Sequence, residues 1–127
     1  MLLKNNIMEI VKIILQVIVG LGILDVWLLR FNSKTSYRGG NAGNMKEEFQ
    51  AYGLPEMMVY IVGFIKVVLA IALLAGIWLE YLVDPAAIGL SVMMLGAIIM
   101  HLKISDPFSK NIPAIIVLLM CIAIYFL

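Results

Sequence analysis

Long apolar stretches separated by short polar breaks dominate this chain. Four of them run over residues 7–31, 57–79, 86–104 and 112–127. A helix that crosses a bilayer needs about 20 mostly apolar residues, because each residue advances the helix by about 1.5 Å. The first three stretches meet this length easily, and the fourth is shorter. The pattern predicts an all-α fold in which a single transmembrane domain, residues 1–127, forms a four-helix bundle.

Helix-starting residues stand ahead of two of these stretches. Asp84 and Pro85 predict an N-cap acceptor followed by a proline in the first position of the third helix. Pro113 predicts the same opening for the fourth helix. These signals place the connection between the second and third helices ahead of Asp84.

The longest polar connection, residues 32–56, is expected to form an ordered cap over one end of the bundle. Asn44 and Glu47 have the spacing of a capping box, and Gly53 with Pro55 supplies a helix stop. The short amphipathic helix between them carries Met45, Phe49 and Tyr52 on one face and Lys46, Glu47 and Glu48 on the other. We expect the first face to dip into the membrane interface and the second to stay in water.

Composition supports lipid as the solvent. Hydrophobic residues make up 64% of the chain and charged residues 13%, against about 45–50% and 25% in soluble domains. The net charge of +1, without a basic run, argues against nucleic-acid binding. With Cys121 as the only cysteine and His101 as the only histidine, one chain has no dithiol pair, no bis-histidine haem ligation and no zinc-ligand cluster. No metal site is predicted.

Polar residues that are costly in a bilayer gather under the long loop, and such residues usually mark function. The candidate polar pocket consists of Asp25, Arg30, Tyr37, Arg38, Lys66, His101 and Asp106. Asp25 lies about 9 Å and Lys66 about 14 Å from the loop-side boundary of their helices. At 100° per residue Asp25 and Arg30 point to different sides, so we expect them to engage different neighbours. A lysine this deep needs a counter-ion, so we predict that Asp25 pairs with Lys66.

Each of these residues also has a plainer interpretation. The Asp25–Lys66 pair is either a structural lock between helices, one wall of a polar pocket, or a contact with a neighbouring chain. His101 is either an interfacial histidine bonded to water or a carbonyl, or a ligand-binding group. The cations Arg30, Lys103 and Lys110 could serve lipid headgroups. Trp27, Trp78 and Tyr81 are expected to anchor the helices at the interfaces.

The distribution of lysine and arginine predicts the orientation. The loop side carries Arg30, Lys34, Arg38, Lys46, Lys103 and Lys110, and the opposite side carries Lys4 and Lys12. Because cytoplasmic loops are enriched in these residues, both termini are predicted to face outward.

Several segments together resemble bacterial members of the DoxX-like family. They are residues 25–30, 37–41, 44–49, 52–55, 63–66, 100–103, 106–107 and 113–114. The resemblance covers nearly the whole chain and implies a four-helix bundle in the bacterial cytoplasmic (inner) membrane. Most such proteins are known only as membrane proteins. Related groups include a membrane subunit of thiosulfate:quinone oxidoreductase and a eukaryotic chaperone for receptor assembly, and neither transfers catalytic residues to this chain.

Three functions are compatible with these features. The first is an accessory subunit that binds a quinone or another isoprenoid for a membrane or peripheral oxidoreductase partner, with Lys66, His101 or Tyr37 bonding to the ligand. This chain would not be an enzyme on its own. The second is a non-enzymatic assembly factor that acts through the cap around Phe49. The third is a small transporter or proton path, for which four helices leave little room unless the protein forms a homo-oligomer.

Overall fold

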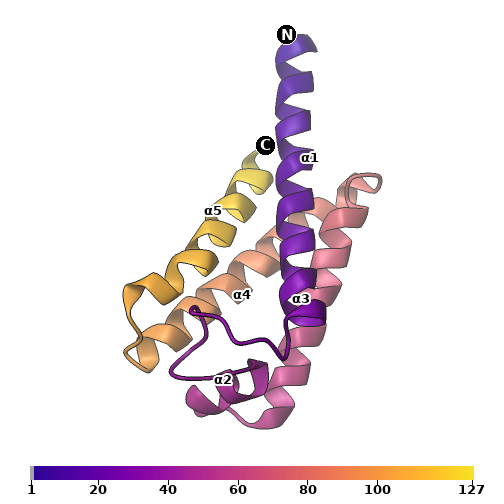
Figure 1. Ribbon diagram of the computed structural model, residues 1–127. Helices are drawn as coiled ribbons and strands as arrows, with labels where there is room; N and C mark the ends of the chain where they lie inside the picture. The colour runs from indigo at the N-terminus through magenta and orange to yellow at the C-terminus, as the bar shows by residue number, and fades with distance from the viewer. Residues whose placement is uncertain (1) are drawn as a thin grey trace.

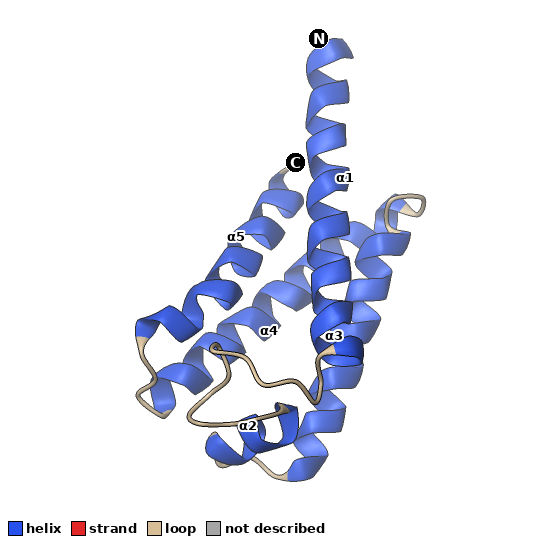
Figure 2. Ribbon diagram, in the orientation of Figure 1, coloured by secondary structure: helices blue, strands red, loops and turns tan. Residues whose placement is uncertain are grey.

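The computed structural model describes the backbone of residues 2–127 and the side chains from Asn6 onward (Figure 1). Helix α1 (Leu2–Leu24) continues into the π-helix η1 (Asp25–Leu29), and a loop leads to the short helix α2 (Met45–Ala51). Helix α3 (Glu56–Ala75) follows, then the 3-10 turn η2 (Glu80–Leu82) and α4 (Val83–Lys103). The 3-10 turn η3 (Phe108–Asn111) precedes α5 (Ile112–Phe126). No strand occurs among residues 2–127, as Figure 2 shows.

Four of these helical segments are long and apolar enough to cross a membrane. They are Asn6–Leu29, Glu56–Ala75, Glu80–Lys103 and Phe108–Phe126. The all-helical fold with four candidate spans is therefore confirmed, together with the short helix α2 between the first two. Both termini lie at one end of the bundle, and α2 with its loop lies at the other (Figure 1). That the termini face outward stays a prediction from the charge bias.

Large apolar side chains cover much of the outer surface of the bundle. Phe64, Trp78 and Phe126 are 72%, 81% and 78% exposed. A soluble protein of this size rarely exposes so much contiguous apolar surface. The interior is filled by small and branched side chains, among them the fully buried Ala70 and Ala87. Small residues let the helix backbones approach closely, which is how helices associate in lipid.

Two helix ends differ from the prediction. Helix α4 begins at Val83 because η2 already winds the chain ahead of it, so Asp84 lies in the first turn and Leu82 takes the N-cap position without a side-chain bond. The predicted N-cap role of Asp84 is wrong, although a carboxylate in the first turn still complements the helix dipole. Helix α3 ends at Ala75, earlier than the apolar stretch does. Pro113 is the second residue of α5, close to its predicted position.

Gln16 compensates for the early end of α3. The final carbonyls of a helix lack intrahelical donors. The carbonyls of Ala72 and Leu74 accept the backbone N–H groups of Gly76 and Ile77. The carbonyl of Leu73 accepts the side-chain amide of Gln16 at 2.9 Å, and Gln16 is only 2% exposed. A polar residue inside α1 thereby joins α1 to the end of α3.

Candidate functional site

Helix α2 has a well-defined start and end. The side-chain oxygen of Asn44 accepts the N–H of Glu47 at 2.9 Å, as the capping box predicts. Glu47 reaches back to the N–H of Gly43 at 3.4 Å. At the other end, the N–H of Leu54 donates to the carbonyl of Phe49 and the N–H of Gly53 to that of Gln50, both at 3.0 Å. With Gly53 at φ 78°, this is a Schellman motif, and it confirms the predicted stop.

The apolar face of α2 is directed into the protein. Met45, Phe49 and Tyr52 are only 4%, 7% and 5% exposed, and they belong to the core. The expectation that they dip into the membrane interface is wrong, because the chain folds α2 back over the end of the bundle. Glu48 was expected to stay in water, but its side chain is 13% exposed and pairs with Arg38. Lys46 and Glu47 are exposed as expected.

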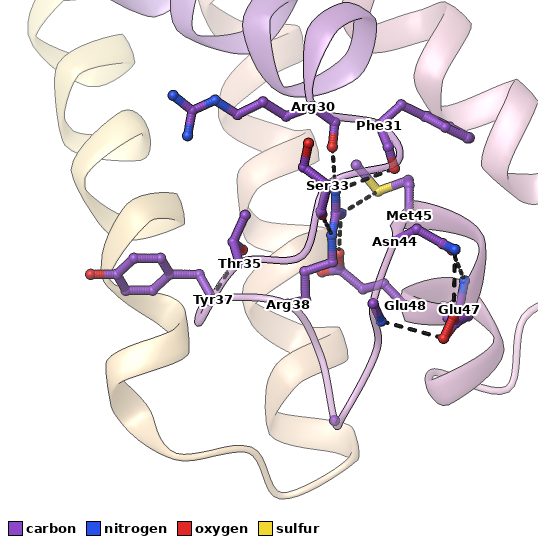
Figure 3. Close-up of polar contacts among 12 residues, drawn as sticks. Arg30, Phe31, Ser33, Thr35, Tyr37, Arg38, Asn44, Met45, Glu47 and Glu48 are labelled. Atoms are coloured by element: carbon purple, nitrogen blue, oxygen red, sulfur yellow. Dashed lines mark hydrogen bonds and ion pairs between the residues drawn. The ribbon is translucent and has the colours of Figure 1, made fainter.

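Arg38 holds the cap together (Figure 3). Its Nη1 donates to Glu48 Oε2 at 2.9 Å, and its side chain is 5% exposed. Its Nε donates to the carbonyl of Ser33 at 2.9 Å, and its Nη2 donates to the carbonyls of Arg30 at 2.6 Å and Phe31 at 3.3 Å. Breaking one side of a buried ion pair usually costs about 3–5 kcal/mol, because the remaining charge is left without a partner. Arg38 therefore anchors the loop to the end of η1.

The Schellman motif at the end of α4 brings Asp106 back against His101. The N–H of Asp106 donates to the carbonyl of His101 at 3.0 Å, and that of Ser105 donates to Leu102 at 3.1 Å. Ser105 takes the left-handed position at φ 57°, which costs a non-glycine residue about 1–2 kcal/mol. The resulting turn places Asp106 Oδ2 at 2.7 Å from His101 Nδ1.

A chain of hydrogen bonds and ion pairs connects this turn with the cap. We call it the polar chain, and its members are Lys110, Asp106, His101, Tyr52, Glu48 and Arg38. Asp106 Oδ1 lies 3.7 Å from Lys110 Nζ and accepts the N–H of Gly40 at 3.1 Å. Tyr52 donates its hydroxyl to Glu48 Oε1 at 2.7 Å and lies 3.4 Å from His101 Nε2. Lys110 Nζ also donates to the carbonyl of Gly40 at 2.6 Å.

Burial and hydrogen bonding set the charge states of Asp106 and Tyr52 in the polar chain. Burial tends to raise the pKa of Asp106. The hydrogen bonds from His101 and Gly40 and the charge of Lys110 outweigh it, so the pKa lies below its usual value. Burial raises the pKa of the Tyr52 phenol, and the neighbouring Glu48 carboxylate raises it further. Asp106 is thus ionised and Tyr52 neutral.

Both ring nitrogens of His101 face acceptors. The ionised Asp106 can only accept from Nδ1. Tyr52 gives its proton to Glu48, so its oxygen presents a lone pair to Nε2. Both ring nitrogens are therefore engaged by protein groups. His101 is 5% exposed.

Asp25 pairs with Arg30, and the predicted Asp25–Lys66 pair is not among the ion pairs of the described residues. Arg30 Nε lies 2.9 Å from Asp25 Oδ2, and the N–H of Arg30 donates to the carbonyl of Asp25 at 2.9 Å. The expectation that the two side chains point apart assumed an α-helix. Residues 25–29 form a π-helix, whose i→i+5 hydrogen bonds bring residues five apart onto one side. The pair is well exposed, with side chains 38% and 60% accessible.

Trp27 and Lys66 meet inside the bundle instead. The ammonium nitrogen of Lys66 lies 5.5 Å from the centroid of the Trp27 ring, within range of a cation–π interaction. Trp27 is 8% exposed, so its predicted role as an interfacial anchor is wrong. Trp78 and Tyr81, at the α3–α4 connection, are 81% and 74% exposed, as anchors would be.

An apolar groove of about 250 Å³ lies between the first span and α3 and is partly open to the outside. Its walls are Trp27, Leu28 and Phe31 on one side and Val59, Tyr60, Gly63, Phe64 and Val67 on the other. Lys46 lies 5.8 Å from the centroid of the Tyr60 ring and 3.2 Å from Glu56 Oε1. The interactions of the Lys46 ammonium, as donor, with Tyr60 and Glu56 raise the pKa of Lys46, so one wall of the groove adjoins a charged group.

The seven residues proposed for a polar pocket are thus divided. The polar chain contains Arg38, His101 and Asp106, while Asp25 and Arg30 form a separate surface pair. Figure 3 shows the Tyr37 ring projecting away from Arg38, and Tyr37 is 48% exposed. Within the described residues, no group of three or more His, Cys, Asp or Glu side chains could hold a metal ion.

Sequence reasoning missed Tyr52, Glu48, Gly40 and Lys110 as partners of His101 and Asp106. A useful signal was present for Tyr52 and Glu48. They are four residues apart on a short helix, so their side chains share a face. No comparable signal connects Gly40 with Lys110, because the two are 70 residues apart.

The sequence model of the DoxX-like family matches residues 36–124. The chain belongs to the DoxX-like family. The matched region contains most of the cap and every member of the polar chain, whereas the wall of the groove formed by Trp27, Leu28 and Phe31 lies outside it. No curated protein and no solved structure matches the chain. As a DoxX-like protein with four candidate spans, it is a multi-pass membrane protein.

Proposed function

We propose that this DoxX-like protein is an accessory membrane subunit that binds a lipid-soluble molecule of the quinone or isoprenoid class for a redox partner. The groove between the first span and α3 carries the proposal. Its walls come from two candidate spans, so a molecule dissolved in the membrane can reach it. Typical small-molecule pockets are about 300–1,000 Å³. A groove of about 250 Å³ suits one ring or a short length of isoprenoid chain.

The walls of the groove favour a flat apolar ligand. Trp27, Phe31 and Phe64 supply aromatic faces that pack against a ring in offset or edge-on geometry. Tyr60 is the hydroxyl-bearing residue of the lining, and the ammonium of Lys46 lies near its ring. A quinone carbonyl would accept a hydrogen bond from that phenol while the tail follows α3 into the membrane.

The polar chain fits a supporting role in this proposal. His101 has both ring nitrogens directed at protein acceptors, and Arg38 donates to five residues within or next to the cap. Groups bonded in this way are poor candidates for direct ligand contact, since a ligand would have to break those bonds first. Contact with the ligand is therefore assigned to the groove. The polar chain also lies entirely at the loop end, which argues against a proton path across the membrane.

Mass spectrometry of an organic extract from gently purified protein, beside a visible absorption spectrum, is the first test. A stoichiometric quinone or other isoprenoid supports the proposal. Phe64→Ala should then lower the amount of bound ligand, because it removes an aromatic wall. Phe108→Ala is the matched control, since Phe108 is 70% exposed against 72% for Phe64 but lies outside the groove. Equal retention in both variants contradicts the groove as the site.

An assembly factor is the alternative, and the cap gives it one supporting observation. Tyr37 is 48% exposed and projects from an otherwise tightly bonded loop (Figure 3), as a contact residue for another protein would. A preparation that carries only bulk phospholipid favours this alternative. Crosslinking from position 37 would then identify the partner, and recovery of no stoichiometric partner counts against it.

A further inference from the structure

The loop that covers the end of the bundle is held at Gly40 from two sides. Asp106 accepts the Gly40 N–H at 3.1 Å, and Lys110 donates to the Gly40 carbonyl at 2.6 Å. Gly40 has φ 56°, which favours glycine, and a Cβ there would lie 3.3 Å from that of Ala51 in α2. The α4–α5 turn therefore clamps one backbone position of the loop, directly above the cap helix.

A continuous run of rings leads from this clamp to the groove. The ring of His101 lies 5.6 Å from that of Tyr52, and the ring of Tyr52 lies 5.9 Å from that of Phe49. The ring of Phe49 lies 6.1 Å from that of Trp27 in a T-shaped pair. Trp27 in turn forms a wall of the groove. All these separations are within the range at which aromatic rings attract one another.

A second connection runs through hydrogen bonds and ends at the same wall. Tyr52 donates to Glu48, Glu48 pairs with Arg38, and Arg38 donates to the carbonyl of Phe31 at 3.3 Å. Phe31 lines the groove beside Trp27. The two connections diverge at Tyr52. Its ring belongs to the run of aromatic rings, and its hydroxyl belongs to the run of hydrogen bonds.

We propose that the His101–Asp106 pair is a latch that controls the groove: while it is closed, the cap presses Phe49 against Trp27, and when it opens, the wall of the groove relaxes. A role for the latch in ligand uptake and release rests on the proposed function. The coupling between the latch and the wall of the groove does not depend on that function. Packed interiors shift between discrete arrangements rather than deforming continuously, so a local change at the latch can move a wall several residues away. The coupling between the latch and the wall is measurable as the response of Trp27 to changes at Asp106.

The chain offers its own reporter. Trp27 and Trp78 are its two tryptophans, and Trp78 lies at the α3–α4 connection. In a Trp78→Phe background, quenching of Trp27 by a bromine-bearing phosphatidylcholine in nanodiscs reports how far the wall has relaxed. Asp106→Asn should shift the equilibrium between the packed and the relaxed wall by about 2- to 30-fold, the range that coupled sites usually give, and thereby raise the quenching of Trp27. Tyr52→Phe, which keeps the ring and loses the hydroxyl, should give a smaller rise.

Two further variants keep the test decisive. Gln16→Leu loosens the bundle where α1 meets the end of α3 and should leave Trp27 quenching unchanged. If it matches Asp106→Asn, the effect is general loosening and the proposal is overturned. If Asp106→Asn does not fold, His101→Phe opens the pair while keeping a ring beside Tyr52, and it should raise quenching in the same direction. Unchanged quenching in the folded latch variants overturns the proposal.

The same samples separate the latch from the proposed function. A short-chain benzoquinone titrated into the parent and the Asp106→Asn variant should bind with dissociation constants that differ by about 2- to 30-fold. Altered lipid quenching without any quinone binding supports the latch and refutes the quinone site. Quinone binding that is equal in both proteins, with equal lipid quenching, supports the site and refutes the latch.

Discussion

Gly63 lets Trp27 pack closely against α3, and replacing it with alanine tests whether that contact fixes the groove. A Cβ built at Gly63 would lie 2.7 Å from both Cε3 and Cζ3 of Trp27. Carbon atoms in contact prefer about 3.5–4.0 Å, so the ring would have to retreat by about 1 Å. Movement of the ring is restricted by its aromatic neighbours, since the ring centroids of Phe31 and Phe49 lie 6.2 Å and 6.1 Å from that of Trp27.

The size of the effect follows from two opposing terms. Overpacking a filled site usually costs about 1–3 kcal/mol. Exchanging glycine for alanine within a helix gains about 0.5–1 kcal/mol. Gly96 in α4 has nothing within 4 Å of its Cβ position, so Gly96→Ala carries the helix gain without the clash. The difference in stability between the two variants isolates the packing term, about 1–3 kcal/mol, because the helix gain is common to both.

The assay is thermal unfolding of both variants in nanodiscs, together with Trp27 emission in the Trp78→Phe background. Gly63→Ala should melt below Gly96→Ala, and its Trp27 emission should shift because the ring has moved. Equal melting temperatures with unchanged emission would refute the reasoning. That result would mean that the added methyl group is accommodated without moving the ring, so the close contact between Gly63 and Trp27 does not fix the groove.

Four other changes probe the cap and the bundle. Because hydrogen bonds and positive charge depress the pKa of Asp106 in the folded protein, its stabilising contribution is complete above its unfolded pKa, near 3.8, and is lost as the pH falls through the folded value. Melting curves should therefore show an acid-side loss of stability that is smaller in Asp106→Asn, and identical pH profiles would contradict the assignment. Ser105→Gly should raise the melting temperature by relieving about 1 kcal/mol of backbone strain, whereas a lower value would show that no strain is stored there. Gln16→Leu should cost about 1–3 kcal/mol, because the carbonyl of Leu73 loses its donor; an unchanged unfolding midpoint would mean that water replaces the amide. Asn44→Ala should cost about 1 kcal/mol through loss of the N-cap, measured as faster amide exchange in α2, and unaltered exchange would argue that tertiary contacts alone hold that helix.

The cap shows how far local reasoning extends. Its start at Asn44 and its end at Gly53 were predictable, because each depends on hydrogen bonds between residues a few positions apart. The direction of its apolar face was not. Met45 and Phe49 could lie equally well in a membrane interface or in a protein core, because both environments are apolar. Only the return of the chain over the bundle end decided between them.

The first span shows the opposite case, in which a local irregularity changed a side-chain partner. The assumption of 100° per residue separates Asp25 from Arg30, and the π-helix η1 brings them within 2.9 Å. A π-turn leaves no distinctive signature in the sequence Asp-Val-Trp-Leu-Leu. Trp27 was equally ambiguous, since tryptophan suits both an interface and a packed core that has Gly63 opposite it.

By itself, the sequence determined the four spans, the all-helical class, the caps of α2 and the concentration of ionisable residues at one end. Each follows from composition or from interactions within one or two helical turns. The tertiary structure decided which of those residues meet. Tyr52 reaches His101 across 49 positions, and Gly40 reaches Asp106 across 66. Pairings this distant depend on how the helices pack and on where the loop returns. A buried polar group must form hydrogen bonds, and only the tertiary structure determines which partners lie close enough.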